Sequence, residues 1–264
     1  MTPADRRAAL EVAEDAARTA GVLLLSHFGR VRAASATRKG RRNLLTVADT
    51  ESEAVIREEL ARAFPDDAIL GEEEGGERLE EGRLWIVDPL DGTTNFAHEL
   101  PMWAVSIALV EDGRVEVGVV LAPRTQECFV AVRGEGAKLD GVEIRVSPTE
   151  ELTDALLATG FAYDRNSLPA NNTANTTDMI MNARDVRRMG AAACDLAYVA
   201  CGRLDGFWEF YLSPWDVAAG ALIVEEAGGL VTDLQGRSGW LFGDTIVAAN
   251  ASLHARMRER LRFE

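Results

Sequence analysis

Apolar residues recur at helical spacing near the start of the chain, at positions 9, 12, 16, 20, 23 and 24. This spacing predicts a helix over 4–28, with Gly29 near its end. A second helix is expected from about Asp49 to Phe64. It should stop at Pro65, because proline lacks the N–H that a continuing helix needs.

Short apolar runs separated by turn residues replace the helical pattern after position 100. We expect strands over 105–109, 115–121, 128–132 and 144–146, divided by turns at 111–113, 123–125 and 140–141. Neighbouring strands joined by tight turns pair antiparallel. The pattern therefore predicts an antiparallel meander.

From about residue 150 strands and helices alternate. The expected strands cover 155–159, 186–189, 206–210, 230–233 and 245–249, and the expected helices 173–182, 191–201, 215–227 and 252–261. Such alternation is typical of an α/β fold. No Gly/Ser linker occurs at 147–151, so we expect two packed halves, 1–148 and 149–264.

The most informative segment is WIVDPLDGTTNF, residues 85–96. Its apolar run ends in two carboxylates three residues apart, Asp88 and Asp91, and Gly92 and Thr93 follow at once. Two hard oxygen ligands would thus lie at the end of a buried strand, before a turn or helix start whose free N–H groups can hold a phosphate. The segment predicts Mg²⁺-assisted phosphate chemistry.

Three further motifs accompany this segment: GEEE at 71–74, PWDVAAG at 214–220 and EEAGG at 225–229. Together they resemble the inositol monophosphatase family, over about residues 8–253. The resemblance implies a layered αβαβα sandwich, with an antiparallel sheet in the first half and a mixed sheet in the second. It also implies a Mg²⁺-dependent, Li⁺-sensitive phosphomonoesterase that forms a homodimer.

The resemblance carries specific roles onto this chain. It implies two or three Mg²⁺ ions per site, with Mn²⁺ as an alternative, and these metal ligands: Glu72, Asp88, the backbone carbonyl of Leu90, Asp91 and Asp216. It implies that Thr93, backed by Asp49, orients the attacking water together with Glu72. Structural alternatives exist: Glu72 as an exposed acid, Asp216 as a first-turn acid of a helix, and Asp49 as a helix N-cap.

Substrate contacts are expected on both sides of the metals. The phosphate should meet Asp91, Gly92 and Thr93, next to Glu72, Leu90 and Asp216. The second half should contribute Gly190, Ala191, Ala192 and Glu209 by resemblance, and Glu209 would accept hydrogen bonds from sugar hydroxyls. An ordinary helix start and a strand-edge charge are the structural alternatives for the last four residues.

The formal net charge of −15 disfavours nonspecific nucleic-acid binding, because a polyanion would be repelled over most of the surface. No apolar run approaches the ~20 residues that span a bilayer, and the charged N-terminus lacks a signal-peptide apolar region. We therefore expect a cytoplasmic protein with no membrane or nucleic-acid partner.

Inositol-1-phosphate is the expected substrate, and three alternatives stay open. Histidinol phosphate could pair its amine with Glu209. Fructose 1,6-bisphosphate or a nucleotide 3′-phosphate would need a second basic site, for which Arg187, Arg188 and Lys39 are the candidates. The fold could also serve as a non-catalytic regulatory binding module.

Overall fold

The computed structural model describes residues 1–31, 37–38, 44–79 and 81–263. Its helices are α1 Pro3–His27, α2 Val47–Ala63, α3 Thr93–Ala97, α4 Thr173–Asn182, α5 Ala192–Ala200, α6 Pro214–Glu226 and α7 Ala251–Arg260. Its strands are β1 Thr37–Arg38, β2 Leu44–Leu45, β3 Ala68–Gly71, β4 Arg83–Asp91, β5 Ala104–Glu111, β6 Arg114–Ala122, β7 Glu127–Val132, β8 Ala137–Leu139, β9 Val142–Glu143, β10 Leu156–Thr159, β11 Asp185–Arg187, β12 Gly206–Phe210, β13 Leu230–Thr232 and β14 Thr245–Ala249.

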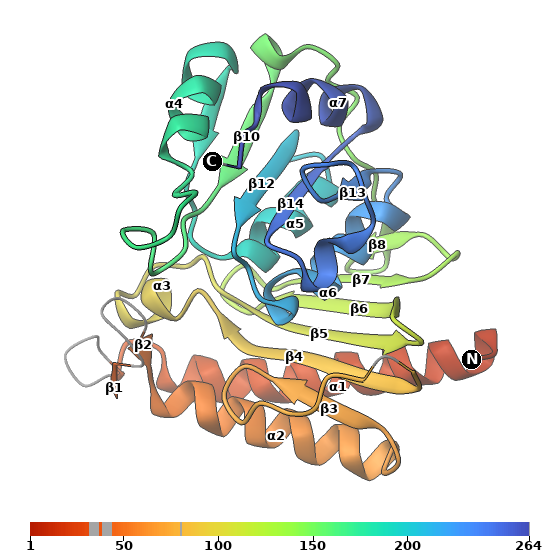
Figure 1. Cartoon of the computed structure of the whole chain (residues 1–264). Coiled ribbons are helices and arrows are strands. Elements are labelled where there is room, and N and C mark those ends of the chain that lie inside the picture. The colour runs from red at the N-terminus through yellow and green to blue at the C-terminus, as the bar shows by residue number, and fades with distance from the viewer. Residues whose placement is uncertain (32–36, 39–43, 80, 264) are drawn as a thin grey trace.

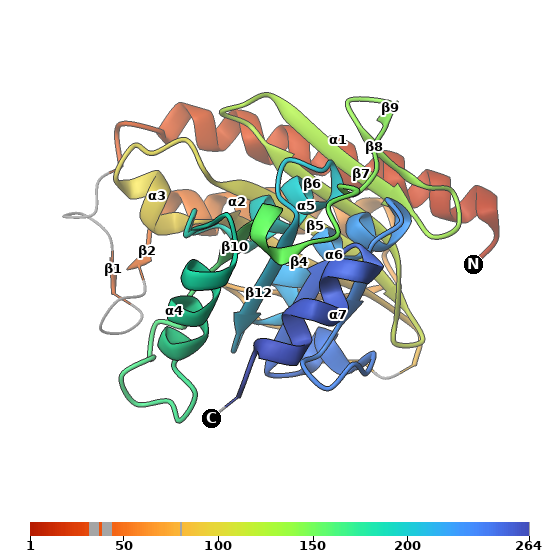
Figure 2. The same ribbon diagram turned by 90° about the horizontal axis from the view of Figure 1, so that it is seen from above.

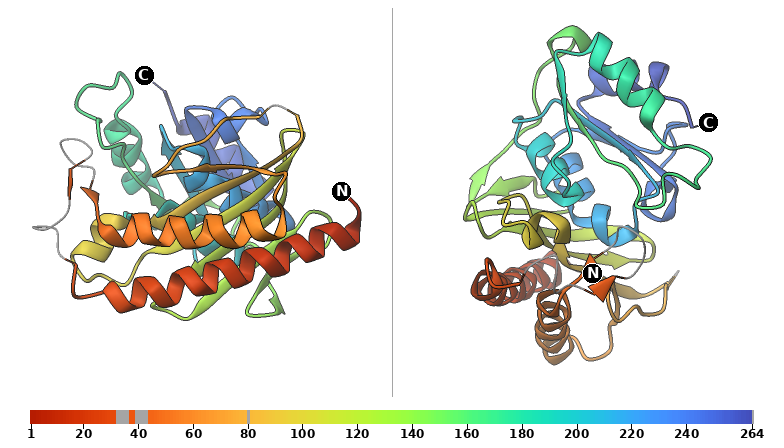
Figure 3. Two further views of the ribbon diagram at one scale, coloured as in Figure 1. Left: turned by 90° about the horizontal axis from the view of Figure 1, so that it is seen from below. Right: turned by 90° about the vertical axis from the view of Figure 1, so that its left-hand side faces the viewer.

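Helices α1 and α2 lie side by side against one face of the first sheet (Figure 3, left). Thr2 and Thr46 cap them, each in a reciprocal pair with an aspartate three residues on, Asp5 and Asp49. The apolar faces of both helices pack on β4, β5 and β6 in one buried cluster. The expected helices are thus confirmed, although α2 begins two residues before Asp49.

The first sheet has seven strands in the order β3-β4-β5-β6-β7-β8-β9. From β4 onward every neighbour pairs antiparallel, so the expected meander is confirmed. β3 departs from it by pairing parallel to β4. The strand expected at 144–146 is wrong: β8 and β9 take the edge of the sheet instead.

Helices α5 and α6 fill the space between the two sheets (Figure 1). Residues 217–224 of α6 are all buried, which explains why its sequence is apolar on every side. The second sheet has the order β11-β10-β12-β14-β13 and is mixed, as expected.

Helices α4 and α7 cover the outer face of the second sheet (Figure 2). The result is the expected αβαβα layering, which the edge-on view displays (Figure 3, right). The division of the chain at 148/149 stays a prediction. Lys39, one candidate for a second basic site, lies outside the described residues.

Candidate active site

The site begins where β4 ends. Residues 84–91 of this strand are buried, and its pairing with β5 becomes irregular between Asp88 and Asp91. Gly92 follows with φ 89° and precedes the five-residue helix α3. A side chain at Gly92 would lie 2.9 Å from the Met102 carbonyl oxygen, so both the backbone conformation and the space require glycine.

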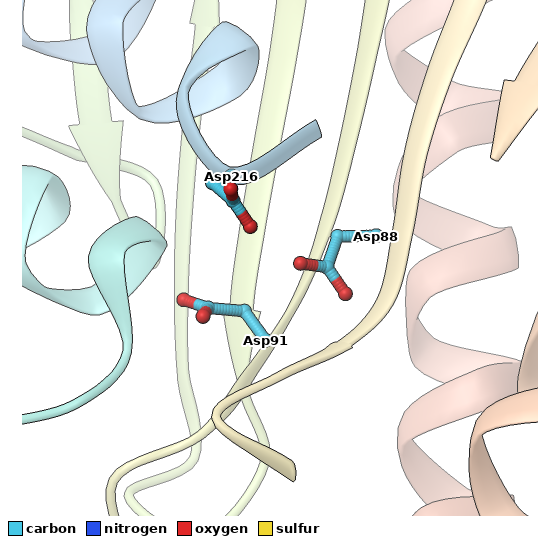
Figure 4. Close-up of side chains that lie close together, drawn as sticks. All are labelled: Asp88, Asp91 and Asp216. Carbon is cyan, nitrogen blue, oxygen red and sulfur yellow. The ribbon is translucent and has the colours of Figure 1, made fainter. Parts of the chain in front are cut away.

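Three aspartates converge beside this strand end. Asp88 and Asp91 come from β4 and Asp216 from the first turn of α6, and their carboxylates face a common space (Figure 4). One oxygen from each lies within 4.8 Å of the others. This is the set of hard, closely spaced oxygen ligands that a divalent cation such as Mg²⁺ requires.

Burial is the main reason why the carboxyl groups of this cluster are weaker acids than usual. It raises the pKa of Asp88 and of Asp216 well above the usual range, and mutual repulsion among the carboxylates, including Glu72, adds to the shift. Burial likewise raises the pKa of Asp91 to about 7, against backbone hydrogen bonds that lower it. Positive charge in the shared space would relieve the repulsion, so the residues fit a bound cation.

The central helices hold two of these carboxylates. The Ala193 N–H, at the start of α5, donates to Asp91 Oδ2 over 2.7 Å. The Ser213 N–H donates to Asp216 Oδ2 over 2.7 Å, so Asp216 is indeed a first-turn acid of α6 as well as a member of the cluster. The two interpretations of Asp216 are therefore compatible.

Glu72 lies on the turn after β3 and is half-buried. Its N–H donates to the Val87 carbonyl oxygen over 3.2 Å, one residue before Asp88. Its side chain lines the same cavity as Asp91 and Asp216. The structure thus brings Glu72 to the site expected for it and not to the open surface.

Thr93 and Asp49 lie together next to the end of β4. Thr93 Oγ1 is 2.9 Å from Asp49 Oδ1 and 3.2 Å from the Leu90 carbonyl oxygen. Asp49 is buried, and this burial raises the pKa of its carboxyl above the usual value despite hydrogen bonds from Thr46 and Thr93. Thr46, not Asp49, is the N-cap of α2, so the N-cap alternative for Asp49 is wrong by three positions.

A cavity of about 380 Å³ opens from the aspartates toward the second half of the chain. Gly190, Ala191, Ala192 and Glu209 line it as expected. Burial raises the pKa of Glu209 to about 8, while the nearby Arg188 guanidinium opposes the shift. Sequence reasoning missed aromatic wall residues such as Phe161 and Tyr163, because no pattern marks the loop after β10 as part of the site.

A second hollow, of about 570 Å³, adjoins this cavity. The two share four wall residues: Phe161, Tyr163, Arg188 and Gly190. Arg165 adds a second guanidinium there, which the sequence did not single out. Arg187, by contrast, pairs with Asp185 on an exposed strand edge and lines neither space.

The profile of the inositol monophosphatase family matches residues 5–263. The chain belongs to this family. It is 47% identical over 248 residues to the protein named Nus factor SuhB of Pseudomonas aeruginosa, covering 91% of each chain.

Solved structures of family members superpose closely on this chain. An inositol monophosphatase from Anabaena matches at a TM-score of 0.87 with 41% identity, over 96% of this chain and 95% of that one. The extragenic suppressor protein SuhB from Bartonella henselae matches at 0.90 with 40% identity, over 97% and 98% of the two chains. The family is generally Mg²⁺-dependent, in agreement with the aspartate cluster. Among the described residues, no helix has the length and apolar character to cross a membrane.

Proposed function

We propose that the protein is a Mg²⁺-dependent phosphatase that hydrolyses a small-molecule phosphate monoester, inositol-1-phosphate first among the candidates. One observation carries the proposal: a three-aspartate cluster, with Asp88 and Asp91 buried and Asp216 half-buried, lies beside the Thr93–Asp49 hydrogen bond and opens into a cavity of about 380 Å³. A bound Mg²⁺ would supply the positive charge that attracts the phosphate and activates water.

The proposed roles follow from the positions of the side chains. The cations would be held by Glu72, Asp88, Asp91, Asp216 and the Leu90 carbonyl. Thr93 and Asp49, with Glu72, orient the attacking water and take up its proton. The N–H groups of Gly92 and Thr93 hold phosphate oxygens, supported by the glycine conformation that starts α3.

Glu209 and the start of α5 are proposed to bind the alcohol part of the substrate. A carboxyl in this cavity can accept hydrogen bonds from vicinal hydroxyls, which favours a polyol. The proximity of Arg188 already supplies Glu209 with a positive neighbour, which weakens the case for an amine-bearing ester such as histidinol phosphate. Arg165 and Arg188 could receive a second anionic group, so bisphosphates stay in the test panel.

The test is release of inorganic phosphate from a panel of polyol, sugar, amino-alcohol and nucleotide phosphates, with Mg²⁺ and with excess EDTA. We expect turnover of inositol-1-phosphate that EDTA abolishes and Li⁺ inhibits. Full activity in EDTA would exclude the metal-dependent chemistry. Light scattering tests the proposed homodimer, since a mass near 28.6 kDa would indicate a monomer.

A second function is favoured by the naming of the curated relatives as Nus factors. We propose that this chain can also act as a binding module, independently of hydrolysis. Complementation of a bacterium lacking its own Nus factor SuhB, by the wild type and by Asp88→Asn, separates the two functions. Rescue by the hydrolysis-deficient variant would support the binding role, and rescue by the wild type alone would assign the phenotype to the reaction.

A further inference from the structure

One face of helix α2 contacts two separate segments of the site, the 85–96 segment at two points and the turn after β3. Asp49 reaches Thr93, as described above. One turn further on, Ser52 donates from Oγ to the Pro89 carbonyl oxygen over 3.0 Å, within the aspartate segment of β4. The next residue, Glu53, faces the turn that carries Glu72.

Glu53 has no exposed surface, yet it is a carboxylate. Its Oε2 accepts the Glu73 N–H over 2.8 Å and its Oε1 accepts the Glu74 N–H over 3.0 Å. Arg57, one turn along the same helix, donates from Nε to Oε1 over 2.8 Å. Burial of a carboxylate is costly unless such donors satisfy it, and here three donors do so.

The turn itself is closed at both ends. The Gly71 N–H donates to the Gly75 carbonyl oxygen over 3.0 Å, and Arg57 donates to the same oxygen from Nη2. A Cβ at Gly71 would collide with the Glu53 carboxylate, so glycine is needed for this close approach. Glu72 therefore sits on a turn whose backbone is bound to α2 through Glu53 and Arg57.

We propose that Glu53 is a positioning residue: it holds the 71–75 turn so that the Glu72 carboxylate stays beside the aspartates, and it thereby sets the affinity of the site for Mg²⁺. The inference rests on the metal-binding role proposed for Glu72. Glu53 itself does not line the cavity, so its effect passes through the backbone of the turn. Helix α2 then holds two segments in a fixed relation, the 85–96 segment through Thr93 and Pro89 and the turn that carries Glu72.

The test is Glu53→Gln, which keeps the size of the side chain but offers one acceptor oxygen where the carboxylate offers two. Mg²⁺ binding to the metal-free protein is measured by calorimetry without substrate, and amide exchange is followed at residues 71–75. We expect Mg²⁺ affinity to fall roughly 10–100-fold, the usual effect of losing a partner behind a ligand. Exchange at Glu73 and Glu74 should accelerate, and saturating Mg²⁺ should restore most of kcat.

Asp205→Asn is the matched control. Asp205 also holds a backbone N–H with its carboxylate, that of Leu156, but at the start of β10 and away from the metal site. It should lose stability without a change in Mg²⁺ affinity. An unchanged Mg²⁺ affinity in folded Glu53→Gln, or an equal loss in Asp205→Asn, would overturn the inference.

Two further variants, Arg57→Gln and Glu72→Gln, complete the test. If Glu53→Gln does not fold, Arg57→Gln keeps both backbone bonds of Glu53 and should weaken Mg²⁺ binding in the same direction, but less; no weakening would overturn the inference. Glu72→Gln tests the underlying assignment. If Glu72→Gln binds Mg²⁺ like the wild type, the proposed role of Glu72 fails; if it loses Mg²⁺ while Glu53→Gln does not, only the positioning role of Glu53 fails.

Discussion

Burial raises the pKa of Asp88, and the nearby carboxylates of Glu72, Asp91 and Asp216 raise it further. Asp88→Asn keeps the shape and removes one of these charges. We expect a nearly inactive protein whose metal-free form melts at a higher temperature than the metal-free wild type, because repulsion in the cluster falls. Phosphate release and thermal melting in EDTA measure the two effects.

The response of the melting temperature to added Mg²⁺ provides the control for this variant. Wild type should gain stability on addition of Mg²⁺, whereas Asp88→Asn should gain little. A wild-type kcat in Asp88→Asn would remove this residue from the metal site.

Thr93 is buried and bonded to Asp49, so its hydroxyl has a fixed orientation. Thr93→Ala should bind Mg²⁺ normally and lose roughly 10²–10⁴-fold in kcat, the usual scale for a positioned acid–base group. Steady-state kinetics at saturating Mg²⁺ measures this loss. Thr125→Ala, which removes a hydroxyl bond in a turn between β6 and β7, should leave kcat unchanged. Equal rates for wild type and Thr93→Ala would contradict the assignment.

Glu209 gives a pH dependence with a definite sign. Its pKa rises from 4.5 to about 8 on folding, chiefly through burial. The unfolded chain releases this proton at lower pH than the folded protein, so the stabilising contribution is complete below about pH 4.5 and is lost as the pH rises through about 8. Glu209→Gln cannot ionise. Relative to the metal-free wild type, its free energy of unfolding should therefore improve from about pH 5 to pH 8, as measured by denaturant melts.

The Glu209→Gln variant also reports on substrate choice. For a polyol phosphate, kcat/KM should fall modestly, because a neutral acceptor remains. For histidinol phosphate it should fall several-fold more, because a charge-assisted hydrogen bond is roughly twice as strong as a neutral one. If the substitution changes kcat/KM for neither ester, Glu209 does not contact the substrate.

At the level of elements, local pattern predicted most helices and strands. It failed where burial has a non-local cause. Ile144 and Val146 alternate like a strand because they pack against the core between the sheets, and the Val146 N–H goes to Ala227 after α6 and not to a neighbouring strand. The parallel pairing of β3 with β4 likewise joins segments separated by the acidic turn, and nothing in either segment encodes its direction.

The packing of α6 on β6 yields an element-scale prediction. A Cβ at Gly118 would lie 2.9 Å from the Ala219 carbonyl oxygen and 3.1 Å from its Cα, neither of which can swing aside. Gly118→Ala should cost about 1–3 kcal/mol of stability, as overpacked cores do. Since α6 carries Asp216, Mg²⁺ affinity should fall as well.

Denaturant unfolding and Mg²⁺ calorimetry measure these two losses. Gly239→Ala is the control, since a Cβ there meets nothing within 4 Å. A Gly118→Ala protein as stable as the control would show that α6 can shift away from β6 without cost.

On the scale of the whole molecule, the site unites residues from β4, α2, the turn after β3 and α6. If the proposed function holds, Mg²⁺ would bind the folded arrangement and not the separated segments. It should therefore raise the melting temperature, and at 100 times its Kd it should add about 2.7 kcal/mol to the free energy of unfolding. Calorimetric melts over a Mg²⁺ series test this, and a melting temperature independent of Mg²⁺ would contradict a preformed cation site.

The same assembly limits what the sequence can reveal of the site. Asp88 and Asp91 stand in one motif and are recognisable together. Tyr163 reaches the cavity, and Arg165 the adjoining hollow, only through the path of the loop after β10. The Ala193 N–H reaches Asp91 only because the start of α5 lies at the end of β4. Backbone donors and loop walls carry no residue-type signal, so only the folded chain shows them.

The walls of the cavity differ in the kind of element that carries them. The aspartates stand on a buried strand and a buried helix, whereas Phe161 and Tyr163 stand on the stretch between β10 and α4, which belongs to neither sheet. Substitutions in that stretch can reshape the space around the alcohol without moving the phosphate end. Descendants of one ancestral chain could thus acquire new substrates, or lose them and keep a binding function, while the inherited aspartate cluster stays in place.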